Sequence, residues 1–166
     1  FRTCDKLCKY IHLPVQAGSD KVLKEMNRKY TGQSYLELVD KLRRACPDIA
    51  ISTDIIVGFP GETESDFEDT LNLVRKVGYD SAFTFLYSVR QGTPAAARED
   101  QVPEEVKHER FNRLVEEINS SSAEKNKAYM GRVEKVLVDG VSRNRDNAYE
   151  GRTDSFKLVN FEGPEG

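Results

Sequence analysis

Long apolar runs are absent from this sequence. None approaches the length that a membrane-spanning helix needs, and residues 1–10 carry charged side chains, so the sequence predicts neither a membrane span nor a signal peptide. Cysteine is also scarce, with three residues in the chain. Three cysteines are few and cannot all pair with one another, so they do not suggest a disulfide framework. This fits a protein of a reducing compartment. These observations favour the cytoplasm.

An excess of basic charge is missing as well. Lys and Arg number 25 against 28 Asp and Glu, which gives a formal net charge of −3, so bulk charge does not support nucleic-acid binding. With 166 residues, of which 38% are hydrophobic and 32% charged, the chain suits one globular domain, or a domain with a small appendage. It contains no internal repeat. Because it begins at Phe1 rather than Met, we expect a fragment of a longer protein.

The central stretch of the sequence predicts a buried strand over residues 49–57. These residues are β-branched and apolar except at three consecutive positions, Ser52, Thr53 and Asp54. Polar side chains inside an apolar strand need a reason.

A tight turn at residues 58–61, Gly-Phe-Pro-Gly, follows this strand. Thr63 and Asp66 then have the spacing of a capping box that opens a helix. In α/β proteins, ligands bind beyond the carboxyl ends of parallel strands, where this turn would lie. The alternative is that Gly and Pro only punctuate a connection, and that Glu62 only favours the positive end of the helix.

The same reasoning places further elements along the chain. Two more strands are predicted at residues 9–15 and 81–88. Helices are predicted after an N-cap at Ser19, along the apolar stripe Tyr35, Leu38, Val39 and Leu42, from Thr63 to Gly78, and over residues 103–127 along the stripe Phe111, Leu114, Val115 and Ile118. Residues before Lys9 are interpreted as the tail of a helix.

The pattern changes after Gly131. Residues 133–138 and 157–161 predict short strands, and Asp139-Gly140 predicts a turn, as in a small β-barrel or sheet module. Four basic residues there, Arg143, Arg145, Arg152 and Lys157, are interleaved with aromatic residues and could contact RNA phosphates and bases. Because acidic residues are also interleaved, a solvated loop of mixed charge is the alternative.

Several segments, taken together and in order, resemble the radical-SAM methylthiotransferases, most closely the MiaB-type branch that acts on tRNA. They are IHLPVQAGSD at 11–20, MNRKYT at 26–31, TDIIVGFPGETESDFEDT at 53–70 and FTFLYSVRQGTPAA at 83–96. The segment GRTDSFKLVNFEG at 151–163 resembles the start of the RNA-binding TRAM domain of that family. The resemblance covers almost the whole chain.

This resemblance implies an α/β fold. Residues 1–128 would form the second half of a radical-SAM partial (β/α)6 barrel with a trailing helix, and residues 129–166 the start of a truncated TRAM module. The two 4Fe-4S clusters of the family would be liganded outside this chain. Cys4 and Cys8 have the first spacing of a cluster motif but lack its third cysteine, so these two are interpreted as buried or incidental thiols, and Cys46, just before Pro47, as a helix-end residue.

The resemblance also implies an activity. The full-length protein would use S-adenosyl-L-methionine (SAM), as methyl donor and as source of a 5′-deoxyadenosyl radical, to methylthiolate C2 of N6-isopentenyladenosine next to the tRNA anticodon. The alternatives are threonylcarbamoyl adenosine or a ribosomal protein as the substrate, or an RNA-binding protein that uses the barrel as a scaffold. This chain would contain no catalytic residue and no metal ligand.

The residues that the resemblance assigns to SAM are Gln16, Gly18, Ser19, Thr53, Asp54, Ile56, Gly58, Phe59, Pro60, Gly61 and Tyr87. In the implied barrel, Ser52, Thr53 and Asp54 would face or border the lumen. His12 is equally well explained as a functional residue or as a hydrogen-bonded core histidine. The tRNA anticodon stem-loop is the expected partner. Since a half-barrel would leave residues 9–15 as an unpaired edge strand, the isolated chain is also expected to self-associate.

Overall fold

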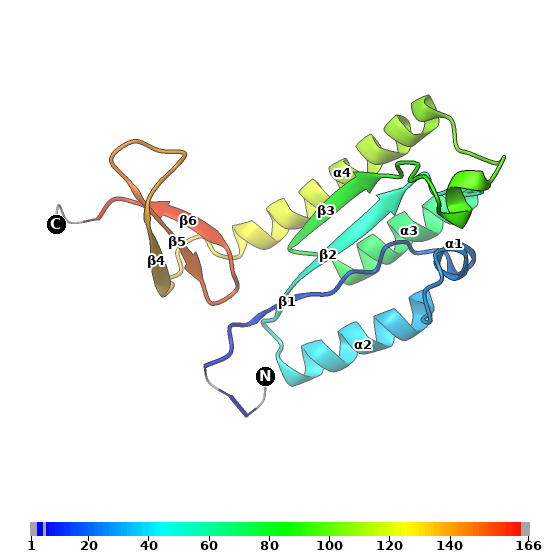
Figure 1. The fold of residues 1–166 in the computed structure, drawn as a ribbon. Coiled ribbons are helices and arrows are strands. Elements are labelled where there is room, and N and C mark those ends of the chain that lie inside the picture. Colours follow the sequence, from blue (N-terminus) through cyan, green and yellow to red (C-terminus); the bar gives the residue numbers. More distant parts are fainter. Residues whose placement is uncertain (1–2, 5, 164–166) are drawn as a thin grey trace.

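The computed structural model describes residues 3, 4 and 6–163 and contains two sheets. The first part comprises β1 (Tyr10–His12), α1 (Asp20–Glu25), α2 (Gly32–Ala45), β2 (Ala50–Val57), α3 (Glu64–Val77), β3 (Ser81–Leu86), the 3₁₀ turn η1 (Pro94–Ala97) and α4 (Glu104–Lys127). The second comprises β4 (Val136–Val141), β5 (Tyr149–Thr153) and β6 (Leu158–Phe161). Figure 1 shows α4 leading from the first part to the second.

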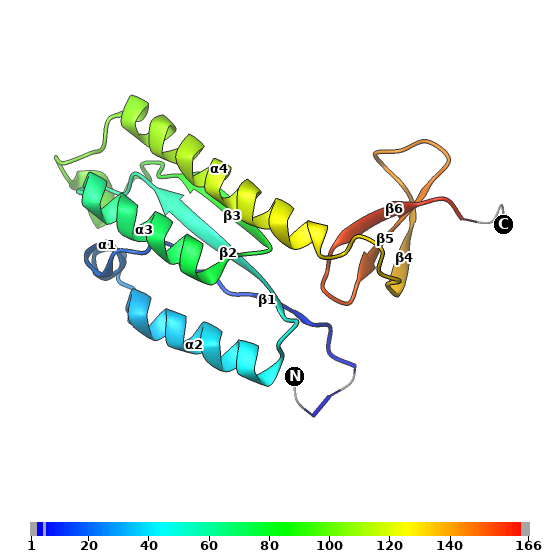
Figure 2. The same cartoon turned by 180° about the vertical axis from the view of Figure 1, so that it is seen from behind.

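The first sheet is parallel, with strand order β1-β2-β3. Helices connect its successive strands, as parallel pairing requires. Figures 1 and 2 show α2, α3 and α4 on one face of this sheet, whereas the opposite face carries no helix among the described residues. The α/β class and the parallel sheet are therefore confirmed, and closure into a partial barrel stays a prediction.

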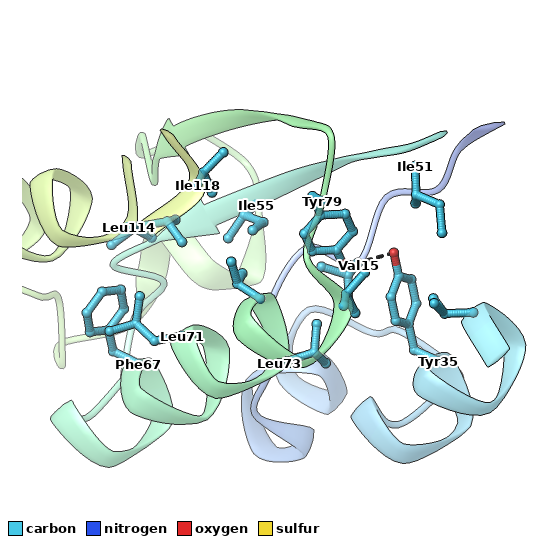
Figure 3. Close-up of a cluster of buried hydrophobic side chains, with 14 of the residues drawn as sticks. Val15, Tyr35, Ile51, Ile55, Phe67, Leu71, Leu73, Tyr79, Leu114 and Ile118 are labelled. Atoms are coloured by element: carbon cyan, nitrogen blue, oxygen red, sulfur yellow. Dashed lines mark hydrogen bonds between the residues drawn. The ribbon is translucent and has the colours of Figure 1, made fainter. Parts of the chain in front are cut away.

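The hydrophobic core lies between the sheet and these helices. Figure 3 shows side chains of β2, α2, α3 and α4 converging there, Ile55 and Leu114 among them. Inside the core the Tyr79 hydroxyl donates to the Tyr35 hydroxyl at 3.0 Å, and Tyr35 donates to the Leu13 carbonyl at 2.7 Å. Burial raises the pKa of both tyrosines, so they stay protonated and can donate.

Two apolar stripes differ from the prediction. On α2, Tyr35 and Val39 are buried but Leu38 is 42% exposed. On α4, Leu114 and Ile118 are buried, while Phe111 and Val115 are only partly buried. Two charged residues on α4, Lys107 and Arg110, are in contrast buried, a feature that apolar periodicity cannot predict.

The segment before β1 corrects another prediction. The described residues among the first eight form turns and bends rather than the end of a helix, and Asp5 lies outside the described residues. Cys4 and Cys8 are exposed, so of the two interpretations, buried or incidental thiols, the first does not apply to them. Cys46 is buried at the C-cap of α2, a helix end as expected.

The second sheet is antiparallel, with strand order β4-β5-β6. The predicted turn at Asp139-Gly140 is wrong, because both residues lie within β4, where the register with β5 shifts between Val138 and Gly140. The sequence analysis missed β5, whose residues Tyr-Glu-Gly-Arg-Thr are too polar to indicate a strand. The small β module is confirmed, and its identity as a TRAM domain stays a prediction.

A cluster around Asp66 joins α1 to α3. Ser19 is the N-cap of α1, and Thr63 and Asp66 form a capping box on α3, as predicted. Asp66 also accepts from the Ser19 hydroxyl at 2.6 Å and from Lys21 Nζ at 2.9 Å. Burial opposes ionisation of Asp66, but the hydrogen bonds from Ser19, Thr63 and Lys21 outweigh it and hold the pKa well below its ordinary value.

We expect Asp66→Asn to destabilise the protein by about 1–2 kcal/mol at neutral pH, since it weakens two helix N-termini. A carboxyl whose pKa is lowered on folding stabilises the fold above its unfolded pKa of 3.8, and this contribution is lost as pH falls below that value. The difference between wild type and variant should therefore narrow below pH 3.8. Urea denaturation from pH 7 to pH 2.5 measures it, with exposed Asp40→Asn as control. A difference independent of pH would contradict the assignment.

Candidate functional site

A cavity of about 770 Å³ lies at the carboxyl ends of β2 and β3, where α/β folds bind ligands. This volume is in the range typical of small-molecule sites. Its lining comes from the β1–α1 connection, the end of α1, both strand ends and η1. The lining residues are Gln16, Glu25, Met26, Asn27, Arg28, Asp54, Ile56, Phe59, Phe85, Leu86, Tyr87, Ser88, Arg90, Thr93, Pro94 and Ala95.

The cavity brings together five of the eleven residues predicted to bind SAM. They are Gln16, Asp54, Ile56, Phe59 and Tyr87. On β2, the partly exposed Asp54 and Ile56 alternate with the buried Ile55 and Val57, as expected for a strand with one face on the core.

Backbone conformation at the cavity is unusual. Gln16 and Asn27 both line it and both have positive φ, of 70° and 58°. Non-glycine residues rarely adopt this region and tend to do so at functional sites. At Gln16 the conformation is held by two backbone hydrogen bonds, from Gln16 N to the Asp54 carbonyl and from Ile56 N to the Gln16 carbonyl, both 2.9 Å.

Tyr87 lines this cavity and carries a hydroxyl that is unpartnered within the described part of the chain. Its ring packs edge-on against Phe59, with centroids 5.3 Å apart. Its hydroxyl oxygen is buried and has no hydrogen-bond partner among the described residues. A buried hydroxyl without a partner is costly, so its position fits a hydrogen bond to a ligand.

Asp54 contributes a carboxylate to the same cavity. Its Oδ1 lies 3.3 Å from His12 Nε2, and its side chain is 29% exposed. His12 is on β1, opposite Ser52 of β2, and Ser52 is adjacent to Asp54 on the same strand face. The sheet register therefore places His12 beside the cavity, although His12 is not in its lining.

Thr53 does not face the open side of the sheet, and the prediction that it does is wrong. Its side chain is fully buried on the helix-covered face, and its Oγ1 accepts a hydrogen bond from Val15 N at 3.0 Å. Successive residues of a strand point to opposite faces, so Ser52 and Asp54 can share a face but Thr53 cannot.

Five other predicted residues also lie outside the cavity: Gly18, Ser19, Gly58, Pro60 and Gly61. A Cβ at Gly18 would lie 2.4 Å from the Thr70 Cα, so glycine is required for the loop to pack on α3. Gly58 has φ +77°, and a Cβ there would lie 2.4 Å from the Lys107 side chain. Any role of these five in SAM binding stays a prediction.

The turn at residues 58–61 is fixed by a buried ion pair that the sequence analysis missed. Arg110 Nη1 of α4 donates to Glu62 Oε1 at 3.0 Å and to the Glu62 carbonyl at 3.1 Å, and Gly58 N donates to Glu62 Oε2 at 3.2 Å. The two side chains are 6% and 2% exposed. Burial raises the pKa of Glu62, while Arg110 and the Gly58 N–H oppose that shift by stabilising the carboxylate.

The four residues predicted to contact RNA fall into two groups. Arg143 and Arg145 are exposed in the loop between β4 and β5, within 3.6–3.7 Å of Glu150 and Glu162 respectively. Arg152 and Lys157 line a second cavity, of about 790 Å³, between the β module and the parallel sheet. All four have acidic neighbours, so the module offers basic groups on two separate surfaces.

At this second cavity the two parts of the chain touch. The rings of Tyr10 and Phe156 stack with centroids 4.7 Å apart, and the Arg152 guanidinium lies 4.4 Å from the Phe156 centroid. Asp80, which precedes β3, lies 3.4 Å from Lys157 Nζ. These contacts fix the β module against the amino-terminal ends of the strands, away from the cavity at their carboxyl ends.

The described residues, 3, 4 and 6–163, contain no group of three His, Cys, Asp or Glu side chains that could hold a metal ion. In the same residues no helix is long and apolar enough to cross a membrane.

Comparison with known proteins shows what the chain is similar to. Residues 2–74, which contain β1, β2 and the turn at 58–61, match the family model of the Radical SAM superfamily. The matched segment includes β2 and the turn, which contribute Asp54, Ile56 and Phe59 to the cavity, and it ends before β3.

Named relatives narrow the class further. The chain is 65% identical over 160 residues to a tRNA-2-methylthio-N(6)-dimethylallyladenosine synthase of Clostridium botulinum (strain Langeland), which covers 96% of this chain and 36% of that relative. It is 60% identical to the synthase of Clostridium tetani and 57% identical to that of Clostridioides difficile, each over 98% of this chain. The chain spans about a third of the length of these relatives, 34–36%. The resemblance to radical-SAM methylthiotransferases is confirmed.

Removing Arg110 by Arg110→Ala should destabilise the protein by about 3 kcal/mol, because the Glu62 carboxylate would stay buried without its partner. Urea denaturation measures this loss. The matched control is Arg75→Ala, which removes an exposed pair with Glu117 and should cost less than about 1 kcal/mol. Replacing both partners together, as in Glu62→Leu with Arg110→Met, should recover part of the loss. Equal effects of the two alanine variants would show that the buried pair does not stabilise the turn.

Proposed function

We propose that the protein containing this chain is a radical SAM enzyme that methylthiolates C2 of N6-isopentenyladenosine next to the tRNA anticodon. The observation that carries the proposal is a cavity that gathers five predicted SAM-binding residues, in a chain 65% identical to enzymes named for the 2-methylthio product. By this proposal the chain supplies one wall of the SAM pocket. Other parts of the protein carry the two 4Fe-4S clusters, and the protein works in the cytoplasm.

The cavity residues fit SAM by size and by chemistry. The adenine ring is planar with aromatic faces, and Ile56, Phe59 and Phe85 offer apolar surface for such faces. Ribose hydroxyls and the amino group are donors, and the Asp54 carboxylate accepts. Tyr87 adds a hydroxyl that can donate or accept.

When bound, SAM would supply the methyl group and the deoxyadenosyl radical, whose formation needs an electron from a cluster. The residues of this chain would bind and orient the ligand. Gln16 has a positive φ and its backbone is hydrogen-bonded to β2. The turn at 58–61 is held by the ion pair between Arg110 and Glu62. A rigid pocket of this kind orients its ligand at little entropic cost.

Recognition of the tRNA is assigned to the β module. Arg152 lies over the Phe156 ring, which already stacks on Tyr10, so the proposed role of Arg152 is phosphate contact. Arg143 and Arg145 lie on an exposed loop, where long basic side chains can reach a phosphate backbone. The anticodon stem-loop is the proposed partner.

Mass spectrometry of tRNA nucleosides tests the activity. Deletion of the full-length gene should remove the 2-methylthio group from isopentenyladenosine, and reintroduction of the gene should restore it. Loss from threonylcarbamoyl adenosine instead would redirect the substrate assignment. If neither nucleoside changes, the proposed tRNA activity is wrong. The remaining hypotheses are then a ribosomal protein as the substrate and an RNA-binding protein without enzymatic activity.

The substitution Tyr87→Phe should affect SAM binding and protein stability differently. Because the Tyr87 hydroxyl is buried without a partner among the described residues, its removal should leave the melting temperature unchanged or raise it. If the hydroxyl bonds to SAM, the same change should weaken SAM binding about 5–10-fold, the equivalent of one hydrogen bond. Equilibrium dialysis of the full-length protein with SAM measures this. Lower stability with unchanged SAM affinity would contradict the role.

The isolated chain is also proposed to self-associate. β1 pairs only with β2 among the described residues, so one side of β1 is an unpaired edge. Phe83 and Phe85, on the open face of β3, are 59% and 49% exposed. Analytical ultracentrifugation of the 166-residue chain should show species larger than a monomer, in proportions that rise with concentration. A single monomeric species at all concentrations would overturn this proposal.

A further inference from the structure

Four polar side chains form a connected row on the open face of the parallel sheet. The Tyr10 hydroxyl lies 2.6 Å from Ser52 Oγ, and Ser52 Oγ lies 2.8 Å from His12 Nδ1. The other ring nitrogen, His12 Nε2, lies 3.3 Å from Asp54 Oδ1. The row therefore runs from the amino-terminal end of β1 to the cavity at the carboxyl ends of the strands.

One arrangement of protons satisfies every contact in this row when the histidine is neutral. The ionised Asp54 carboxylate can only accept, so the proton of a neutral His12 belongs on Nε2, which faces Asp54 Oδ1 across an ion-pair contact of 3.3 Å. Nδ1 of a neutral ring is then an acceptor, and Ser52 must donate to it. Ser52 in turn accepts from the Tyr10 hydroxyl. All donors in the row thus point toward Asp54.

This row is not needed to complete the sheet. The backbone ladder pairs β1 with β2 and β2 with β3 without any of these side chains. His12 and Asp54 are 37% and 29% exposed, so water could solvate both groups, and neither depends on the other to satisfy a buried charge. Their alignment therefore points to a role at the cavity.

Asp54 is where the row meets the cavity. Its carboxylate has no hydrogen-bond or ion-pair partner other than His12 among the described residues, which leaves Oδ2 as an acceptor for a ligand. The other charged groups in the lining are Glu25, Arg28 and Arg90. Glu25 is already paired with Arg98 at 2.7 Å, which leaves Asp54 as the carboxylate without a basic partner in this lining.

We propose that His12 is a positioning residue that holds the Asp54 carboxylate in one orientation, so that Asp54 accepts hydrogen bonds from the hydroxyl or amino donors of the bound ligand. This inference rests on the proposed function, which makes SAM the ligand. Without the histidine the carboxylate is free to rotate about its side-chain torsions, and binding must then restrict that freedom at an entropic cost.

The experiment compares SAM affinity among variants of the reconstituted full-length protein by equilibrium dialysis. His12→Phe keeps a planar ring but removes the donor to Asp54, and should raise the Kd for SAM about tenfold, which corresponds to about 1.4 kcal/mol. His12→Gln is the matched variant, because its amide nitrogen reaches about as far as Nε2 and can donate to the carboxylate. It should restore most of the affinity.

A double-mutant cycle shows whether His12 acts through Asp54. Asp54→Asn alone should also raise the Kd about tenfold, and adding His12→Phe to it should change the Kd less than about twofold. If His12→Phe does not fold, Ser52→Ala serves instead, since it removes the donor to Nδ1 and keeps the ring. It should raise the Kd by about threefold.

Three results would overturn the proposal. His12→Phe could leave the Kd unchanged while Asp54→Asn raises it, or His12→Gln could be as damaging as His12→Phe, and in either case the SAM site itself would stand. If the wild-type protein binds no SAM, both the positioning role and the proposed function fail.

Discussion

The turn that places Phe59 at the cavity is held by the buried ion pair between Arg110 and Glu62. The turn at residues 58–61 contains two glycines, each with φ of +77°. Glycine can adopt many backbone conformations, so contacts from outside the turn are needed to select this one. Arg110 binds both the side chain and the carbonyl of Glu62, and Gly58 N binds the same carboxylate. α4 therefore closes the turn from a distance of 48 residues along the chain. Burying two charges costs free energy, so the pair serves geometry more than stability.

Local features were predictable because their causes are local. The N-cap at Ser19 and the capping box of Thr63 and Asp66 depend on neighbours within three residues, and both were found from sequence. The Asp66 contacts with Ser19 and Lys21, 47 and 45 residues away, were not. Neither was Arg110, since a buried arginine on a charged helix has no periodic signal. β5 was missed because its stability comes from pairing on both sides rather than from apolar residues.

In the candidate site, too, local features could be predicted from the sequence and long-range ones could not. The strand that carries Asp54 and the turn that follows it were recognised from residue types, but the face on which each residue lies was not. Side chains alternate between the two faces of a strand, so knowing the face of one residue fixes the face of all the others. The burial of Ile55 against the helices places Thr53, two residues earlier, on the same face. The contribution of η1 to the cavity could not be predicted, because it depends on how the connection after β3 folds back over the strand ends.

Tyr10 belongs to both parts of the chain. Its hydroxyl begins the row of polar contacts that ends at Asp54, and its ring stacks on Phe156 of the β module. A side chain held at the ring by one part and at the hydroxyl by the other has little rotamer freedom left. Movement of the β module relative to the sheet would have to break the ring stack, the hydroxyl contact or the backbone register of β1. The position of the β module and the order of the polar row therefore stabilise each other, although the cavity lies at the opposite end of the strands.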